Sequence, residues 1–165
     1  NMTTAVLLGL TLTFEPKEHG IMQRPPRDPK GSLLTPQLIG RIISVGAMLL
    51  LGAFGLFKWT LISGASEAYA RTVAVNVFVM VETVYLFNCR SLRRGIFAGD
   101  FWGNPYVFAG AGITILLQIL FTYAPFMNAA FRTEPIGLDA WLQILAVAAV
   151  AAGLVEVEKK LRIFG

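Results

Sequence analysis

Four long apolar segments decide what this chain can fold into. They cover residues 38–57, 72–87, 106–123 and 141–157, and turn-forming or charged stretches separate them. A helix crosses a bilayer with about 17 to 25 apolar residues, so the second and fourth segments are at the short end of the range. Hydrocarbon offers the backbone no hydrogen-bond partners, and these segments lack the strict alternation of barrel strands. The pattern therefore predicts four membrane-spanning α-helices.

The composition agrees with this prediction. Hydrophobic residues make up 55% of the 165 residues and charged residues 15%, with a mean hydropathy of +0.63. This balance lies outside that of ordinary soluble domains. The single cysteine, Cys89, excludes an internal disulfide and a zinc site built from paired cysteines. We therefore expect an all-α integral membrane protein.

The first apolar stretch, residues 1–14 ("NMTTAVLLGLTLTF"), is too short to be a fifth span. At about 1.5 Å per residue it covers roughly 21 Å of a hydrocarbon layer about 30 Å thick. It predicts half a membrane-spanning helix. Such a half helix indicates either a fragment of a larger protein or a re-entrant segment, and we expect the fragment.

Basic residues are distributed unevenly among the loops. Most of the 14 Lys and Arg residues fall in loop 15–37, in loop 88–105 or near the C-terminus. Because cytoplasmic loops carry the excess of Lys and Arg, we expect a multi-pass cell-membrane protein with these loops and the C-terminus in the cytoplasm. The net charge of +4 then reflects topology and attraction to anionic lipid headgroups. The charges are dispersed and accompany no recognition motif, so we expect the lipid bilayer as a partner and no nucleic acid.

Several short motifs carry a family resemblance. The stretch "FEPKEHGIMQRPPRDP" follows "NMTTA" and precedes "YLFNCRS", "NPY", "ILFTYAPFMNAAF" and "WLQIL". Together they resemble the C-terminal membrane region of a bacterial type II, calcium-pump-like P-type cation-transporting ATPase, over essentially the whole chain. The resemblance implies that residues 1–14 are the latter half of transmembrane helix six and that residues 15–37 form a cytoplasmic proline-rich loop. Residues 38–165 would then form a four-helix transmembrane support domain, helices seven to ten, with a short cytoplasmic tail.

One carboxylate lies within the second apolar segment. Burying an ionisable residue such as Glu82 in a membrane is costly, so it indicates an ion pathway by default. The alternative is a protonated structural residue that is hydrogen-bonded to a neighbouring span. In the family that the chain resembles, a ligand on helix eight lies six residues before an asparagine. Glu82 stands six residues before Asn88, so the resemblance implies that Glu82 is a cation ligand.

The resemblance also implies ligands in the half helix. The family pattern on helix six is Asn, Thr three residues later, then Asp, and here the matching residues are Asn1, Thr4 and Ala5. Asn1 and Thr4 would lie on one helix face, as metal ligands or in a helix–helix hydrogen bond. Calcium needs about six to eight oxygen ligands, so the remainder would come from helices four and five of a longer chain. Without a carboxylate at position 5, we expect no two-calcium site; one divalent ion, a monovalent ion and proton coupling stay open.

The sequence contains neither an Asp-Lys-Thr-Gly phosphorylation motif nor a glycine-rich phosphate loop, so we expect no catalytic residue and no bound cofactor in this chain. The resemblance implies a parent pump that uses ATP and magnesium to move calcium, another metal or a monovalent cation. Its implied partners are helices one to six and the phosphorylation and actuator domains. The alternative is a stand-alone four-span membrane interaction or scaffold module without transport activity.

Two further expectations concern helix packing. Gln118 has no evident partner in the sequence, and we expect it to be structural. Small residues let helix backbones approach closely in membranes. We therefore expect close-packing faces on the first and fourth segments, formed by Gly46, Gly52 and Gly55 and by Ala146, Ala149 and Gly153.

Overall fold

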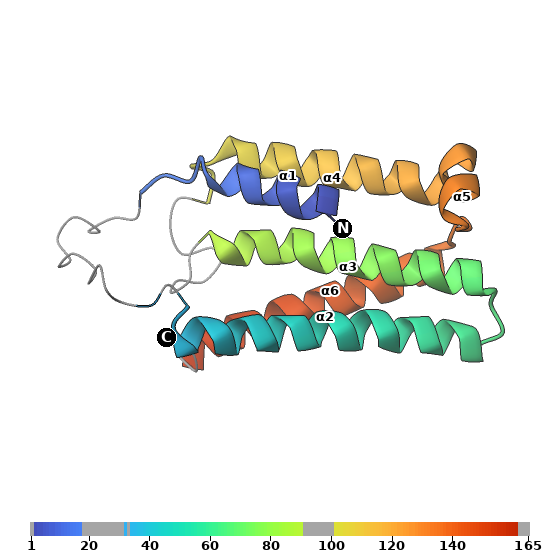
Figure 1. Ribbon diagram of the computed structural model, residues 1–165, viewed down its shortest axis with the longest axis horizontal. Helices are drawn as coiled ribbons and strands as arrows, with labels where there is room; N and C mark the ends of the chain where they lie inside the picture. Colours follow the sequence, from blue (N-terminus) through green and yellow to red (C-terminus); the bar gives the residue numbers. More distant parts are fainter. Residues whose placement is uncertain (1, 18–31, 33, 91–100, 162–165) are drawn as a thin grey trace.

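The computed structural model describes residues 2–17, 32, 34–90 and 101–161, and all regular secondary structure in these ranges is helical. The helices are α1 (Met2–Leu12), α2 (Pro36–Ile62), α3 (Glu67–Cys89), α4 (Pro105–Tyr123), α5 (Pro125–Phe131) and α6 (Leu138–Leu161). All except the short α5 run roughly lengthwise in one bundle (Figure 1).

The prediction of four membrane-length helices is confirmed. Within the described residues, four helices are long and apolar enough to cross a bilayer: α2 (counted from Leu38), α3, α4 and α6. Most of them extend beyond the apolar segments because polar side chains cap them outside. Thr35 accepts a hydrogen bond from Leu38 N at 3.2 Å, and Ser66 accepts one from Tyr69 N at 3.0 Å. Such caps satisfy amides that would otherwise lack partners at the start of a helix.

The bundle has two distinct ends. α1 and α3 finish where α2 and α4 begin, and we call this the Arg90 end (Figure 1). The turn between α2 and α3 and the short α5 lie at the opposite end, which we call the Glu67 end. The start of α1 lies near the middle of the bundle (Figure 1), and that residues 1–14 are the latter half of a membrane-spanning helix stays a prediction.

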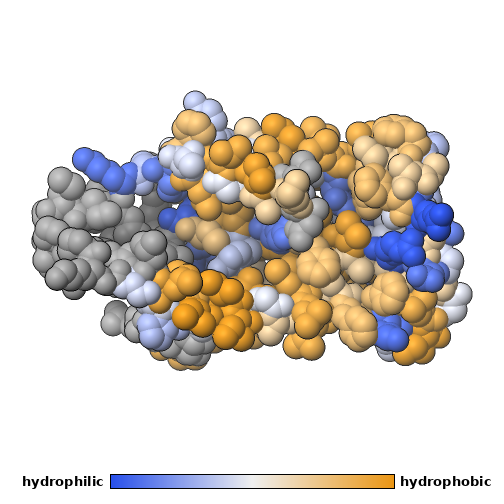
Figure 2. All heavy atoms as spheres, viewed as in Figure 1, coloured by the Kyte–Doolittle hydropathy of each residue, from blue (hydrophilic) through white to orange (hydrophobic). Residues whose placement is uncertain are grey.

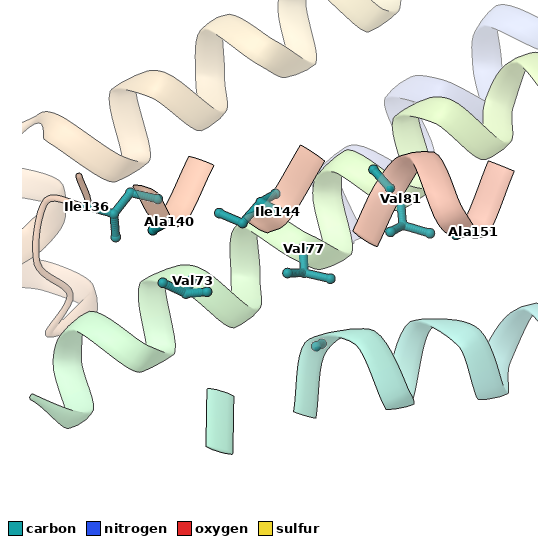
Figure 3. Close-up of a cluster of buried hydrophobic side chains, with 9 residues drawn as sticks. Val73, Val77, Val81, Ile136, Ala140, Ile144 and Ala151 are labelled. Atoms are coloured by element: carbon teal, nitrogen blue, oxygen red, sulfur yellow. The ribbon is translucent and has the colours of Figure 1, made fainter. Parts of the chain in front are cut away.

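Helix α3 is the centre of the bundle. It packs against α1 and α4 on one side and against α2 and α6 on the other. The main apolar cluster lies on the second side, where Val73, Val77 and Val81 face α6 residues such as Ile144 (Figure 3). A smaller cluster of Leu8, Leu86 and Val107 joins α1, α3 and α4. The four-residue spacing of the α3 valines places them along one stripe of the helix.

The outer faces of the bundle remain strongly apolar. Large hydrophobic side chains are exposed along α2, α4 and α6, and Figure 2 shows apolar residues over much of the face that it draws. A surface of this kind is suited to lipid tails or to further membrane helices.

The predicted small-residue faces are mostly wrong. Gly52 does lie in a close contact, because an added Cβ would come within 2.7 Å of Val147 Cγ1. A Cβ added at Gly46, Gly55 or Gly153 would meet no described atom within 4 Å. Ala146 and Ala149 are exposed, and α6 instead packs through residues such as Ala140 and Ala148. A helix that is apolar on all sides carries small residues in several directions, so its sequence does not show which side is covered.

Candidate cation site

The candidate site lies between α1 and α3, about halfway along the bundle. Thr4 Oγ1 on α1 donates a hydrogen bond to Glu82 Oε2 on α3 at 3.0 Å. The Glu82 side chain is half-buried, and Thr4 is buried with 8% exposure. A carboxylate and a hydroxyl from separate helices therefore meet inside the apolar part of the bundle.

Parallel packing of two helices positions this pair. Leu8 lies one turn beyond Thr4, and Leu86 lies one turn beyond Glu82. Leu8 and Leu86 belong to the same buried cluster, so the two helices run in register over this stretch. Val107 of α4 completes the cluster, where α1, α3 and α4 pack together. The apolar contact thus brings α1 and α3 together on the side where Thr4 faces Glu82.

The structure brings together two of the three predicted ligands. Glu82 and Thr4 are in contact, whereas Asn1 lies outside the described residues. Ala5, which stands where the family pattern has a carboxylate, is exposed. Asn88, the residue whose spacing indicated Glu82, is buried on the other side of α3. There it lines a cavity of about 10 Å³ together with Val45 and Ala152.

The Thr4–Glu82 pair has the oxygen chemistry that a hard cation prefers. Carboxylate and hydroxyl oxygens are the ligands that calcium and similar cations prefer. In the part of the chain that the structure describes, no three His, Cys, Asp or Glu side chains are grouped as a metal cage. A complete calcium site has about six to eight oxygen ligands, so these two side chains alone would not form one.

A polar network between α3 and α4 was not predicted from the sequence. Gln118 Nε2 donates to Asn76 Oδ1 at 3.0 Å, and Asn76 Nδ2 donates to Thr122 Oγ1 at 3.1 Å. All three side chains are buried. The view that Gln118 has no evident partner is thus wrong, because Asn76 pairs with it. The only signal was a second polar residue, Asn76, in the neighbouring apolar segment; buried polar groups in membranes seek such partners.

Two ion pairs at the Arg90 end were also missed. Arg90 Nε lies 2.9 Å from Glu15 Oε1, which joins the end of α3 to the residues that follow α1. Arg41 Nε lies 2.9 Å from Glu158 Oε1, which joins α2 to α6, and both of these side chains are buried. The sequence shows the charges but not which helices meet.

The fold and the site define a class: an α-helical multi-pass membrane protein with a polar pair inside its bundle. The chain belongs to a specific family within this class, since the family model described as "Cation transporting ATPase, C-terminus" matches residues 1–161. The resemblance inferred from the sequence motifs is thereby confirmed.

Individual relatives agree with the family match. The "Probable cation-transporting ATPase F" of Mycobacterium tuberculosis (strain ATCC 25618 / H37Rv) is 48% identical over 148 residues, which is 90% of this chain. "Cation-transporting ATPase pma1" of Synechocystis is 34% identical over 86% of the chain, and the "Calcium-transporting ATPase" of Bacillus subtilis is 26% identical over 91%. This chain spans 16% of the length of the mycobacterial and cyanobacterial relatives and 17% of that of the Bacillus protein.

Proposed function

We propose that this chain is the part of an ATP-driven cation pump in which Glu82 and Thr4 supply two oxygen ligands of the intramembrane cation site. The observation that carries the proposal is the 3.0 Å hydrogen bond between Thr4 Oγ1 and Glu82 Oε2 in the middle of the bundle. When a cation enters, the carboxylate supplies negative charge, and the hydroxyl can turn its lone pair toward the ion. Asn1, one turn before Thr4 in the sequence, is proposed as a third ligand.

The other helices have a supporting role in this proposal. α4 packs against α1 and α3, and α2 and α6 pack against α3. α2 and α4 contain no Asp or Glu, and Glu158 of α6 is paired with Arg41. The remaining ligands would come from helices four and five of the parent protein. ATP and magnesium would act in its phosphorylation and actuator domains. The transported ion would be calcium, another metal or a monovalent cation.

We also propose that the Arg90 end faces the cytoplasm. Arg41, Arg90 and Lys159 lie at this end, together with the exposed Lys160. The Glu67 end carries fewer basic residues, among them Arg71 and Arg132. An excess of Lys and Arg marks the cytoplasmic side of a membrane protein. Residues 15–37, residues 88–105 and the C-terminus would then be cytoplasmic, in a protein of the cell membrane.

The test uses the full-length parent pump, purified and titrated separately with calcium, manganese and sodium while ATP hydrolysis is measured. Glu82→Gln keeps the shape of the side chain and removes its charge. We expect it to raise the half-activating cation concentration about tenfold or more, because ligand charge tunes the affinity of oxygen sites. Thr4→Val should give a smaller increase. Glu67→Gln, an exposed residue on the same helix, is the matched control and should change nothing. Unchanged cation activation in the Glu82→Gln pump would exclude Glu82 from the site.

A further inference from the structure

A carboxylate just beyond α1 is held by two other helices at the Arg90 end. Arg90 Nε lies 2.9 Å from Glu15 Oε1 and 3.1 Å from Glu15 Oε2. The Arg90 side chain is only 8% exposed and that of Glu15 is 22% exposed. Arg90 also donates to Phe101 O, and its guanidinium lies 5.7 Å from the Phe101 ring centre. These contacts fix the direction of the Arg90 side chain, so the carboxylate has a defined partner.

Asn104 binds the same carboxylate from the start of α4. Its Nδ2 donates to Glu15 Oε2 at 2.9 Å and to Thr11 O, in the last turn of α1, at 3.0 Å. Its Oδ1 accepts from Tyr106 N at 3.1 Å and so caps α4. Asn104 is 1% exposed, and it lies where the end of α1, the end of α3 and the start of α4 meet. We call Glu15, Arg90 and Asn104 the Glu15 joint.

The Glu15 joint lies on the same two helices as the candidate site. Arg90 is eight residues after Glu82, about 12 Å along α3 at 1.5 Å per residue. Between the joint and the site, α1 is held by the Leu8–Leu86–Val107 cluster and by Gly110, where an added Cβ would collide with Thr11 Cγ2. Apolar contacts of this kind are non-directional, so they do not by themselves fix the position of α1 along its axis. An ion pair with defined hydrogen-bond geometry does fix that position.

We infer that Glu15, Arg90 and Asn104 are positioning residues that fix the height of α1 relative to α3 and thereby keep Thr4 within reach of Glu82. The inference rests on the proposed function, because it assigns the joint a role in cation affinity. A shift of α1 by a fraction of a turn would separate Thr4 Oγ1 from Glu82 Oε2, which are now 3.0 Å apart.

The test is a double-mutant cycle in the full-length pump, titrated with the cation that best stimulates the unmodified protein. Glu15→Gln and Arg90→Gln should each raise the half-activating cation concentration about three- to thirtyfold. This is the usual range for substitutions that affect a binding site without contacting the ligand. The maximal rate should change much less. The double variant should resemble either single variant, because removing the second partner of a broken pair costs little more. Arg90→Lys keeps the charge and should recover part of the affinity.

The matched control is the Arg41–Glu158 pair, which lies at the same end, is buried and has the same 2.9 Å separation, but joins α2 to α6. Glu158→Gln should lower the thermal unfolding midpoint and leave the half-activating cation concentration unchanged. Normal cation affinity in Glu15→Gln and Arg90→Gln pumps, beside weakened affinity in Glu82→Gln, would overturn the inference and leave the proposed function standing. Normal affinity in Glu82→Gln would overturn both. An equal loss of affinity in Glu158→Gln would show general destabilisation and would also overturn the inference.

Discussion

Asn76 on α3 and Gln118 on α4 are hydrogen-bonded to each other inside the bundle, 3.0 Å apart. Thr122, one turn beyond Gln118, accepts a further hydrogen bond from Asn76 at 3.1 Å. Helix association in membranes depends on close packing and on such interhelical hydrogen bonds, because the lipid is as apolar as the side chains. The network is therefore a specific link between α3 and α4.

The first prediction concerns this link. Gln118→Leu should destabilise the protein by about 0.6 to 2 kcal/mol, because it removes an interhelical hydrogen bond and leaves Asn76 Oδ1 less well satisfied. The measurement is the thermal unfolding midpoint of the purified pump in detergent. Gln143→Leu is the control, since Gln143 is an exposed glutamine on α6. Equal midpoints for the two variants would contradict a stabilising role for the network.

The second prediction concerns the close approach of α1 and α4. Gly110→Ala should destabilise the bundle by about 1 to 3 kcal/mol, the usual cost of overpacking, because the new Cβ would collide with Thr11 Cγ2. Gly112→Ala, two residues along the same helix, meets no described atom within 4 Å and should be neutral or slightly stabilising. Both effects can be read from the yield and the unfolding midpoint of purified protein. A neutral Gly110→Ala would mean that α1 is packed less tightly than described.

The third prediction concerns Arg132, which ends α5 with a φ of 51°. A left-handed conformation costs a residue with a side chain about 1 kcal/mol or more, and glycine adopts it freely. Arg132→Gly should therefore raise the unfolding midpoint slightly or leave it unchanged, although glycine loses more entropy on folding. Arg132→Val should lower it, because a β-branched side chain is the least suited to this conformation. The backbone oxygen that accepts from Arg71 is kept in both variants. A stability order with valine above glycine would refute the argument.

The fourth prediction concerns membrane orientation. In a full-length pump whose Cys89 is replaced by alanine, Ser63→Cys at the Glu67 end should react with an impermeant thiol reagent added to intact cells. Ser32→Cys, between the half helix and α2, should react only after the membrane is opened, because the basic-rich side faces the cytoplasm. Both serines are exposed, so access to the reagent differs by side and not by burial. The reverse labelling pattern would invert the proposed orientation.

Much of the architecture could be predicted from the sequence because the membrane restricts the choices. Apolar segments of spanning length can only be helices. Their ends were predicted less well, because the caps Thr35 and Ser66 let α2 and α3 begin before the apolar segments do. Glu82 was recognised because burying an ionisable residue in a membrane is costly in free energy, and Thr4 was recognised by its place in a family pattern. The structure brings these two side chains together, and whether they bind a cation stays a prediction.

The pairing between helices could not be predicted. A soluble helix shows its buried side as a stripe of apolar residues, but a membrane helix that is apolar all round shows none. For this reason Gln118 was left without its partner Asn76, and Gly153 was assigned to a contact that the described structure does not make. Charges gave no better guide, since Glu15 and Arg90 are far apart in the sequence and meet only because α1 and α3 are parallel.

The arrangement of helices around α3 has a mechanical consequence. The α1–α4 pair and the α2–α6 pair both pack against α3. In the described residues, the helices of one pair do not pack against those of the other. At the Glu67 end they are nevertheless tied, because Trp141 Nε1 of α6 donates to Tyr123 Oη of α4 at 2.7 Å. At the Arg90 end, each pair is instead bonded to α3, through Glu15 and Arg90 on one side and through the hydrogen bond that Lys159 Nζ donates to Asn88 O on the other. A movement of either pair at this end would therefore act on α3, the helix that carries Glu82.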